Sequence, residues 1–415
     1  MRIAVIFDNF GPYHLARLRA AAGVCELTAI EVAASSAEYA WERSGEDAEI
    51  LNSESRNEFQ DSDFKHVTLF QQSTSREIPR RELVRKMNEV LDACCPQAVF
   101  IPGWSSRAAF AASSWCVQNN VPAVAMSEST EWDEVRTGWK EWAKRKFVGL
   151  CAAALAGGTP HKDYLIKLEM PAECIFLGYD VVDNGYFAQG AKEVRSQKDE
   201  VRKKHRLPEN YFLASARFIA KKNLPRLLQA YALYRKKAKI GNQKAEIWNL
   251  VVLGDGLLHG AFNSQLSTLN LHGCVLLPGF KQYPELPAYY GLASAFIHAS
   301  TKEQWGLVVN EAMASGLPVL VSNRCGCAVD LIKDGVNGFT FDPYNVEQLA
   351  GLMLKISAFN FPLSTFSAAS TDIIADWGVE RFAQGLKSAV ECALQAGPVK
   401  PTLPQRLLSK ALLWK

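Results

Sequence analysis

The chain has 415 residues, of which 48% are hydrophobic and 21% are charged, and its formal net charge is +3. This length predicts two or three domains, and the composition is that of a globular rather than a disordered protein. The small net charge argues against a dedicated nucleic-acid-binding protein, which would carry a concentrated basic surface.

No two of the ten cysteines have the spacing of a zinc knuckle or a redox dithiol. The N-terminal residues run directly into a strand-like segment without the layout of a secretory signal. The longest apolar run, residues 147–158, is shorter than the roughly 18 residues that a spanning helix needs. We therefore expect reduced thiols in a cytoplasmic protein that is at most peripheral at the inner membrane surface.

Short apolar segments alternate with longer helix-patterned segments along most of the chain, which is typical of parallel α/β layers. The segments are apolar on both faces, as strands covered by helices on both sides should be. The predicted strands are residues 3–7, 27–32, 66–70, 98–102, 123–126, 153–157 and 175–177 in the first half, and 212–216, 248–253, 275–277, 295–298, 318–321 and 339–341 in the second. Residues 34–63 lack a clear pattern and are either a flexible acceptor-side loop or a plain exposed insertion.

A polar stretch near residues 190–200 interrupts this rhythm. We expect one doubly wound, Rossmann-like domain over residues 1–190 and a second over residues 200–375. Such domains bind ligands at the carboxyl ends of their strands, so a cleft between the two would be the site.

The segment over residues 300–319 contains the strongest functional signal. A predicted strand ends before a loop with Glu303, and a helix begins near Gly306, where glycine lets the backbone approach a ligand. The N–H groups of Leu307 and Val308 would open this helix and could bind a diphosphate. Glu303 and Glu311 could accept hydrogen bonds from sugar and ribose hydroxyls, although two glutamates alone are more often solvated charges.

A second signal lies between a predicted strand and a predicted helix, where Arg217 precedes Lys222 by five residues. Two cations at the end of one strand can neutralise a departing diphosphate, the arginine as a bidentate fork and the lysine as a point charge. Taken alone, such a pair is more often plain surface charge.

Together the two segments resemble the retaining glycosyltransferases of family 4. That family has an Arg–Lys pair after the first strand of its second domain and a Glu-x7-Glu segment, and nearly every fixed position of the latter is present over residues 303–319. Further matching segments are residues 178–187, 252–256, 278–281, 334–339 and 377–382. The resemblance extends over roughly residues 175–390 and is weak over residues 1–170.

The resemblance implies a GT-B fold, in which two Rossmann-like domains face each other across a cleft. It also implies a terminal helix over about residues 378–396 that crosses back to the N-terminal domain. A basic amphipathic tail follows at residues 397–415.

The resemblance further implies a role for each matching residue. Arg217, Lys222 and Glu303 would be catalytic: the two cations would hold the donor phosphates, and Glu303 would grip the sugar. The expected donor-binding residues are Glu311 at the ribose, the backbone of Gly306, Leu307 and Val308, the glycine turn at Gly254, and the nucleotide-facing loop with Gly279, Phe280 and Lys281.

The implied reaction moves a hexose from a UDP or GDP donor to a hydroxyl of a glycan, a lipid-linked or a small-molecule acceptor, as in polysaccharide biosynthesis. Anomeric configuration would be retained by front-face attack. No metal and no cofactor other than the nucleotide sugar is expected, because cationic side chains would do the work of a divalent ion.

The N-terminal half departs from the family pattern at two places. Where the family usually has adjacent glycines, this chain has one glycine, Gly11, and a proline. His14 either contacts the acceptor or donor or has a helix-capping or packing role. Where many members carry a histidine, this chain has Glu128, which either binds the sugar or belongs to a polar loop. Both places are expected on the acceptor or sugar side.

Residues 139–147 and the tail combine aromatic, aliphatic and basic residues at helical spacing. Such a segment is either a helix lying on an anionic bilayer or an ordinary amphipathic helix with Trp139, Trp142 and Phe147 packed inward.

The glycine pattern also bears on rival functions. An oxidoreductase is disfavoured because the third glycine of residues 254–260 falls one position late and no acidic residue follows about 20 positions on. A GT-B phosphorylase, a sugar-nucleotide epimerase and a non-catalytic nucleotide-binding module remain as alternatives.

Overall fold

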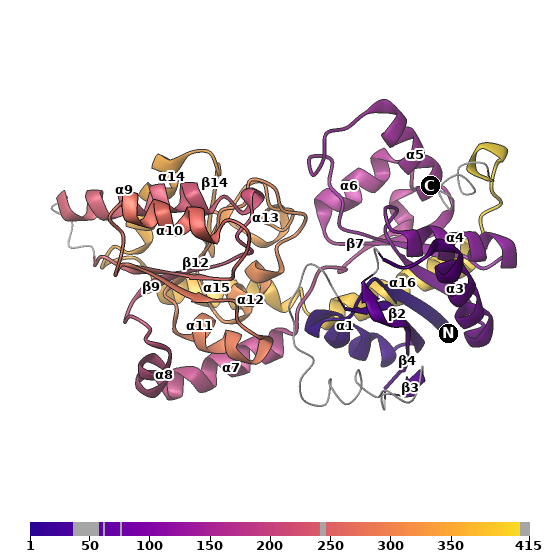
Figure 1. The fold of residues 1–415 in the computed structure, drawn as a ribbon, viewed down its shortest axis with the longest axis horizontal. Coiled ribbons are helices and arrows are strands. Elements are labelled where there is room, and N and C mark those ends of the chain that lie inside the picture. The colour runs from indigo at the N-terminus through magenta and orange to yellow at the C-terminus, as the bar shows by residue number, and fades with distance from the viewer. Residues whose placement is uncertain (36–57, 61–62, 75–76, 241–245, 407–415) are drawn as a thin grey trace. The chain divides into compact units, whose positions relative to one another are not determined.

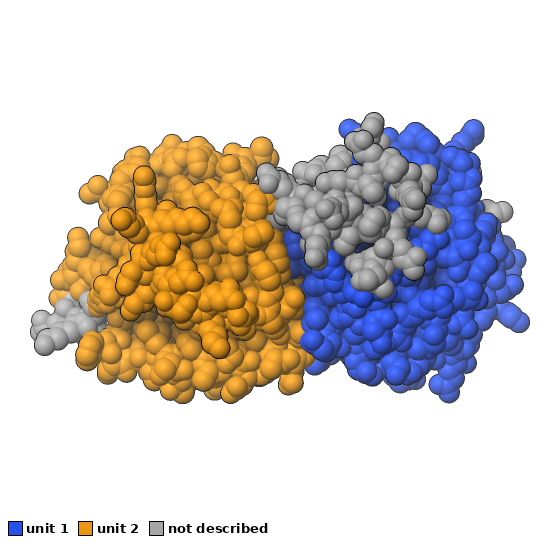
Figure 2. All heavy atoms as spheres, turned by 90° about the horizontal axis from the view of Figure 1, so that it is seen from below, with its two compact units in different colours: residues 1–181, 379–415 blue, residues 182–378 orange. Residues whose placement is uncertain are grey.

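The computed structural model describes residues 1–35, 58–60, 63–74, 77–240 and 246–406. The chain divides into two compact units, one made of Met1–Val181 with Val379–Lys415 and the other of Val182–Gly378 (Figure 2). Each unit is built on its own sheet with helices on both faces (Figure 1). The second unit is thus inserted into the chain of the first.

The first unit contains an eight-stranded sheet in the order β3-β4-β2-β1-β5-β6-β7-β8. Its strands are β1 (Arg2–Phe7), β2 (Glu26–Ser35), β3 (Glu58–Gln60), β4 (Lys65–Thr74), β5 (Ala98–Pro102), β6 (Ala123–Ser127), β7 (Cys151–Ala156) and β8 (Ile175–Leu177). Its helices are α1 (Pro12–Ala22), α3 (Arg80–Cys94), α4 (Arg107–Asn119), α5 (Gly138–Val148), α6 (Thr159–Lys167), the 3-10 turn η1 (Ala172–Cys174) and α16 (Val379–Ala396). All pairings are parallel except that of β3 with β4.

The core of the first unit lies on both faces of this sheet. Alternate residues of β1 enter different clusters: Ile6 packs with α3 and α4, whereas Val5 packs with α1 and α16. This double burial explains why the strands read as continuous apolar runs.

The second unit contains a six-stranded parallel sheet in the order β11-β10-β9-β12-β13-β14. Its strands are β9 (Tyr211–Ser215), β10 (Asn249–Leu253), β11 (Val275–Gly279), β12 (Ala295–His298), β13 (Val319–Ser322) and β14 (Gly338–Phe341). Its helices are α7 (Asn184–Ser196), α8 (Lys198–His205), η2 (Ala220–Lys222), α9 (Leu224–Ile240), α10 (His259–Thr268), η3 (Tyr283–Glu285), α11 (Leu286–Leu292), α12 (Leu307–Ala314), α13 (Ala328–Leu331), α14 (Val346–Ile356) and α15 (Leu363–Ala375). Helices α9, α10 and α14 cover one face, and α7 and α11 cover the other (Figure 1).

The prediction of two doubly wound α/β domains is confirmed, since every predicted strand is present in these sheets. Strand β3 was not predicted, and most of the patternless segment around it lies outside the described residues. The division between the units falls at Val181, earlier than the expected residue 190. The reason is that α7 packs on α11 of the second unit, with Phe187 and Ala191 buried in the contact.

In the second unit the chain leaves β9 toward both sides of the sheet, to β10 and β11 on one side and to β12 on the other. A parallel sheet opens a crevice at the carboxyl ends of its strands where the strand order reverses in this way. The segments that follow β9 and β12 therefore border the natural ligand site of this unit.

Candidate functional site

The segments that follow β9 and β12 are tied together by hydrogen bonds. The N–H of Thr301 donates to the carbonyl of Lys221 at 2.8 Å. The side-chain amide of Asn223 donates to the carbonyls of Ala299 at 3.0 Å and Pro343 at 2.8 Å, and Asn223 is only 3% exposed. These bonds fix the cationic segment after β9 against the acidic segment after β12.

The centre of the site is the carboxylate of Glu303. Its Oε2 atom is bonded to the ammonium group of Lys222, to Nε2 of His298 at 3.0 Å and to the hydroxyl of Ser300 at 3.1 Å. Burial alone would raise the pKa of Glu303, but the charge of Lys222 and the hydrogen bond from His298 outweigh it and hold the pKa well below its usual range. Glu303 is therefore ionised at neutral pH.

Further cations surround this carboxylate. Burial lowers the pKa of Lys221, the charge of Glu303 opposes that shift, and the charges of Lys222, Arg217 and Lys302 add to it. Arg217 is half-buried in the segment after β9. Four positive groups thus gather at the carboxyl ends of β9 and β12, where a diphosphate would be attracted.

Helix α12 begins beside Glu303. Gly306 stands at its N-cap with φ = 108°, a left-handed conformation that favours glycine. The N–H groups of Leu307 and Val308 form the first turn and have no backbone acceptor within the described part of the chain. Cations, a helix N-terminus and an ionised carboxylate therefore meet at one place.

Glu311 lies about one turn further along α12 and is only 1% exposed. Burial raises the pKa of the Tyr290 hydroxyl well above its usual range, and the charge of Glu311 raises it further. The carboxylate of Glu311 therefore lies against the hydroxyl of Tyr290 in α11.

The glycine turn after β10 packs on the segment that carries Arg217. The N–H of Gly254 donates to the carbonyl of Gly279 at 2.9 Å. A Cβ atom at Gly254 would lie only 2.0 Å from the carbonyl oxygen of Ala216, so no larger residue fits. The expected donor-binding loops after β9, β10 and β11 are therefore in mutual contact.

The two side chains expected beside the nucleotide differ in their surroundings. Phe280 is 38% exposed. The ammonium group of Lys281 is bonded to Glu285 at 3.3 Å and lies 5.7 Å from the centre of the Tyr289 ring. Lys281 is thus paired within its own segment.

In the first unit, Gly11 and His14 form the start of α1. The N–H of Gly11 donates to Nδ1 of His14 at 3.2 Å, and the His14 ring lies 4.5 Å from that of Phe7. Burial and the nearby Arg17 lower the pKa of His14 to about 3, so the imidazole is neutral. This hydrogen bond from Gly11 is a helix-capping contact, so His14 has the capping role that the sequence left open.

Glu128 stands after β6 and is half-buried beside Asp180. Burial and then the charge of Glu128 raise the pKa of Asp180 well above its usual range, whereas Arg17, 3.9 Å from Asp180, opposes this shift. Glu128 thus belongs to a charged cluster at the carboxyl ends of the strands of the first unit.

The helix over residues 139–147 is present as α5, but its two tryptophans do not pack inward. Trp139 is 63% and Trp142 is 47% exposed, and only Phe147 enters the core. The inward-packing alternative is therefore wrong for the tryptophans. Within the described residues no helix is long and apolar enough to span a bilayer.

The tail contacts α5 through Gln405, whose side-chain amide donates to the carbonyls of Lys146 at 3.2 Å and Gly149 at 3.0 Å. The rest of the predicted amphipathic tail, residues 407–415, lies outside the described residues. All ten cysteines lie within the described residues as free thiols.

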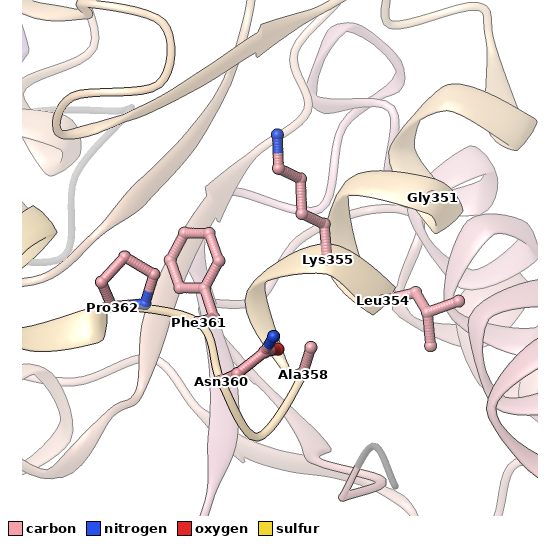
Figure 3. Close-up of a pocket in the computed structure, with 7 residues that line it drawn as sticks. All are labelled: Gly351, Leu354, Lys355, Ala358, Asn360, Phe361 and Pro362. Atoms are coloured by element: carbon pink, nitrogen blue, oxygen red, sulfur yellow. The ribbon is translucent and has the colours of Figure 1, made fainter. Parts of the chain in front are cut away.

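A hollow on the second unit lies apart from this cluster (Figure 3). It is lined by Gly351, Leu354, Lys355, Ala358, Asn360, Phe361 and Pro362. These residues belong to the last turns of α14 and the segment after it, whereas the site residues follow the carboxyl ends of the strands. Helix α14 follows β14 and runs antiparallel to it, so the last turn of α14 lies toward the amino ends of the strands, away from the site.

Sequence reasoning missed His298, Ser300, Lys221 and Asn223 at this site. His298 offered a signal, because it is a polar residue at the end of an apolar predicted strand. Asn223 offered none, since its acceptors come from segments up to 120 residues away in the chain.

Residues 197–359 match the family model described as "Glycosyl transferases group 1". This part of the chain is therefore similar to the group 1 glycosyl transferases. The matched residues include the whole cluster around Glu303, with both predicted phosphate-binding cations and both glutamates. The match thus agrees with the resemblance to glycosyltransferases that the sequence indicates for this part of the chain.

Curated relatives match about a third of the chain. A probable sucrose-phosphate synthase 4 from Oryza sativa subsp. japonica is 31% identical over 156 residues, which are 35% of this chain and 14% of the relative. An alpha-monoglucosyldiacylglycerol synthase from Streptococcus pneumoniae is 31% identical over 148 residues, which are 35% of this chain and 31% of the relative. The matches therefore extend over less than a third of these relatives' own length.

Solved structures are similar over nearly the whole chain. A glycosyltransferase from Rickettsia africae ESF-5 has a TM-score of 0.69 at 16% identity, with 94% of this chain and 98% of that one covered. Anabaena Alr3699/HepE in complex with UDP and glucose has a TM-score of 0.68 at 16% identity, with 93% and 98% covered. The two units thus have the GT-B fold of glycosyltransferases.

Proposed function

We propose that this glycosyltransferase-like chain transfers a sugar from a nucleotide-diphosphate donor to a hydroxyl group, without a metal ion and with retention of anomeric configuration. The observation that carries the proposal is the grouping of Lys222, Glu303 and the first turn of α12 at the switch point of the second unit. Such a grouping places cations and free N–H groups for a diphosphate beside an acceptor for sugar hydroxyls.

In the proposed reaction, Arg217 and Lys222 bind the donor phosphates and stabilise the charge that develops as the bond to the sugar breaks. Glu303 accepts hydrogen bonds from the sugar hydroxyls and fixes the sugar relative to the departing diphosphate. The acceptor hydroxyl attacks from the same face, and its proton passes to a phosphate oxygen. Glu311 binds the ribose, and the cations take the place of a divalent ion.

The donor is best tested first with UDP compounds. Among the similar structures, Anabaena Alr3699/HepE is in complex with UDP and glucose, and an Escherichia coli protein is bound with UDP-2-fluoro glucose. At 16% and 10% identity these likenesses concern the fold, so GDP donors remain in the test. A glycan, a lipid-linked or a small hydroxyl compound is the proposed acceptor class.

The deciding experiment is a thermal-shift panel with UDP, GDP, ADP, dTDP and their sugar conjugates, run with EDTA and with magnesium. We expect a several-degree rise with one nucleotide series, unchanged by EDTA and lost in Lys222→Ala. The anomeric proton signal of the transfer product, read by NMR, then tests retention. No rise with any nucleotide on folded protein would contradict the proposal and favour a non-catalytic role.

We further propose peripheral contact of the first unit with an anionic bilayer through α5. The exposed Trp139 and Trp142 stand on this helix with the exposed Lys140 and the partly exposed Arg145. Aromatic side chains beside basic ones suit the boundary between headgroups and acyl chains. Sedimentation with phosphatidylglycerol vesicles should fall in the double variant Trp139→Ser with Trp142→Ser, and equal sedimentation of both proteins would refute the contact.

A further inference from the structure

The hydrogen bonds to the carboxylate of Glu303 all reach one of its two oxygens, Oε2. Lys222, His298 and Ser300 all bond to Oε2, and Oε1 has no hydrogen bond within the described part of the chain. A carboxylate oxygen can accept more than one hydrogen bond, so this arrangement is chemically complete at Oε2. Oε1 is left to accept hydrogen bonds from a ligand.

The two strand-borne donors differ from Lys222 in rigidity. His298 is the last residue of β12, is 2% exposed and has its ring stacked against Phe296 at an interplanar angle of 10°. Ser300 follows two residues later and is also buried. Lys222, in contrast, has a long side chain with a compact charge on a flexible stem.

The protonation state of His298 follows from its surroundings. Burial lowers the pKa of His298 although the hydrogen bond to Glu303 acts in the opposite direction. The imidazole is therefore neutral at pH 7 and has one N–H group. Because an ionised carboxylate only accepts hydrogen bonds, that proton is on Nε2 and is donated to Glu303.

A donor diphosphate would compete with Glu303 for the ammonium group of Lys222. If Lys222 alone oriented Glu303, the carboxylate would lose its orientation at the moment of donor binding. We propose that His298, with Ser300, is the positioning residue that keeps Glu303 aligned for the donor sugar while Lys222 turns to the diphosphate. This inference rests on the proposed function and deepens it by naming what fixes the sugar-binding carboxylate.

The test compares three variants of one small region. His298→Leu removes the N–H donor, and His298→Gln keeps an amide N–H at a similar reach. Cys327→Ala is the packing control, because the Cys327 sulfur and His298 Nε2 are each 3.6 Å from the same point, the Cβ position at Gly306. Each variant is first checked for an unchanged melting temperature.

The measured quantity is the affinity for UDP and for UDP-glucose by isothermal titration calorimetry, or for the corresponding pair of the nucleotide series that the thermal-shift panel selects. We expect all proteins to bind the nucleoside diphosphate within about twofold. His298→Leu should bind the sugar conjugate about tenfold more weakly, since it loses a hydrogen bond to a charged group. His298→Gln should recover most of this loss, and Cys327→Ala should match the wild type.

The outcomes separate the two proposals. If the wild-type protein binds no nucleotide, the proposed function fails. If it binds the sugar conjugate more tightly than the diphosphate and His298→Leu keeps that difference, the positioning role is overturned while the function stands. Ser300→Ala is a second variant with a small change in volume. It should weaken binding of the sugar conjugate and leave binding of the nucleoside diphosphate unchanged. If His298→Leu and Ser300→Ala both bind the sugar conjugate as tightly as the wild type, the positioning role is overturned.

Discussion

The side-chain amide of Asn223 bridges the backbone carbonyls of Ala299 and Pro343, and so it joins the ends of three segments at the site. Asn223 also has φ = 57°, a left-handed conformation that asparagine tolerates better than most residues. One residue thus satisfies two carbonyls and permits the turn between η2 and α9.

We predict that Asn223→Gly and Asn223→Ala both destabilise the second unit. Each leaves two buried carbonyls without their donor, which costs about 2 kcal/mol or more. The alanine variant should lose about 1 kcal/mol more, because only glycine accepts the left-handed conformation freely. Urea unfolding followed by fluorescence measures both changes, and equal stability of wild type and Asn223→Gly would show that the bridge contributes nothing.

The ionised state of Glu303 has a consequence for stability against pH. The pKa of Glu303 lies below the usual 4.5 in the folded protein. The ionised carboxylate therefore stabilises the folded protein above pH 4.5, and this contribution is lost as the pH falls from 4.5 toward the folded-state pKa. The difference in unfolding free energy between wild type and Glu303→Gln should therefore shrink from pH 7 to pH 3. A difference that stays constant over this range would contradict the ion pair with Lys222.

His14 should remain neutral far below the pH at which an exposed histidine gains a proton. Its pKa is lowered from 6.5 to about 3 by burial and by Arg17. Since the unfolded chain binds the proton first, the contribution of His14 to stability falls as the pH drops from 6.5 toward 3. An NMR titration should find no change of the His14 ring between pH 8 and pH 5, and a midpoint near 6.5 would refute the buried helix cap.

Gly254 and Gly279 provide a matched pair for testing close packing in the loops of the site. Both have positive φ, but only at Gly254 would a Cβ meet a backbone oxygen, at 2.0 Å, and Gly279 faces open space. Gly279→Ala should cost about 1–2 kcal/mol from backbone strain alone. Gly254→Ala should cost clearly more and weaken nucleotide binding, as read by denaturation and calorimetry; similar losses in both would contradict the crowding.

The fold was predictable because its strands are buried on both faces. Strand β5 is a continuous apolar run and β12 is one up to its last residue, His298, and the expected bounds of both coincide with the observed ones. Strand β3 was not predictable, since it has three residues, two of them polar, and pairs antiparallel at the edge of the sheet. The unit boundary was placed too late because α7 is mostly polar and buries only Phe187 and Ala191.

The site was predictable where spacing along the chain carries the chemistry. Arg217 and Lys222 belong to one short segment, and Glu303 to another with a specific glycine and helix start. The partners of these residues were not predictable, because they depend on which strands lie side by side. That Lys222 reaches Glu303 follows from the pairing of β9 with β12, two strands separated by 79 residues.

The insertion of the second unit into the first bears on the order in which the chain can fold during synthesis. Phe382, Leu386 and Val390 of α16 complete the cluster that α1 and β1 begin, yet they follow the entire second unit in the sequence. During synthesis the apolar face of α1 therefore lacks its partner α16 until almost 400 residues have been made. The second unit, whose elements are contiguous in the sequence, can therefore fold before the first, in contrast to the usual N-terminal-first order.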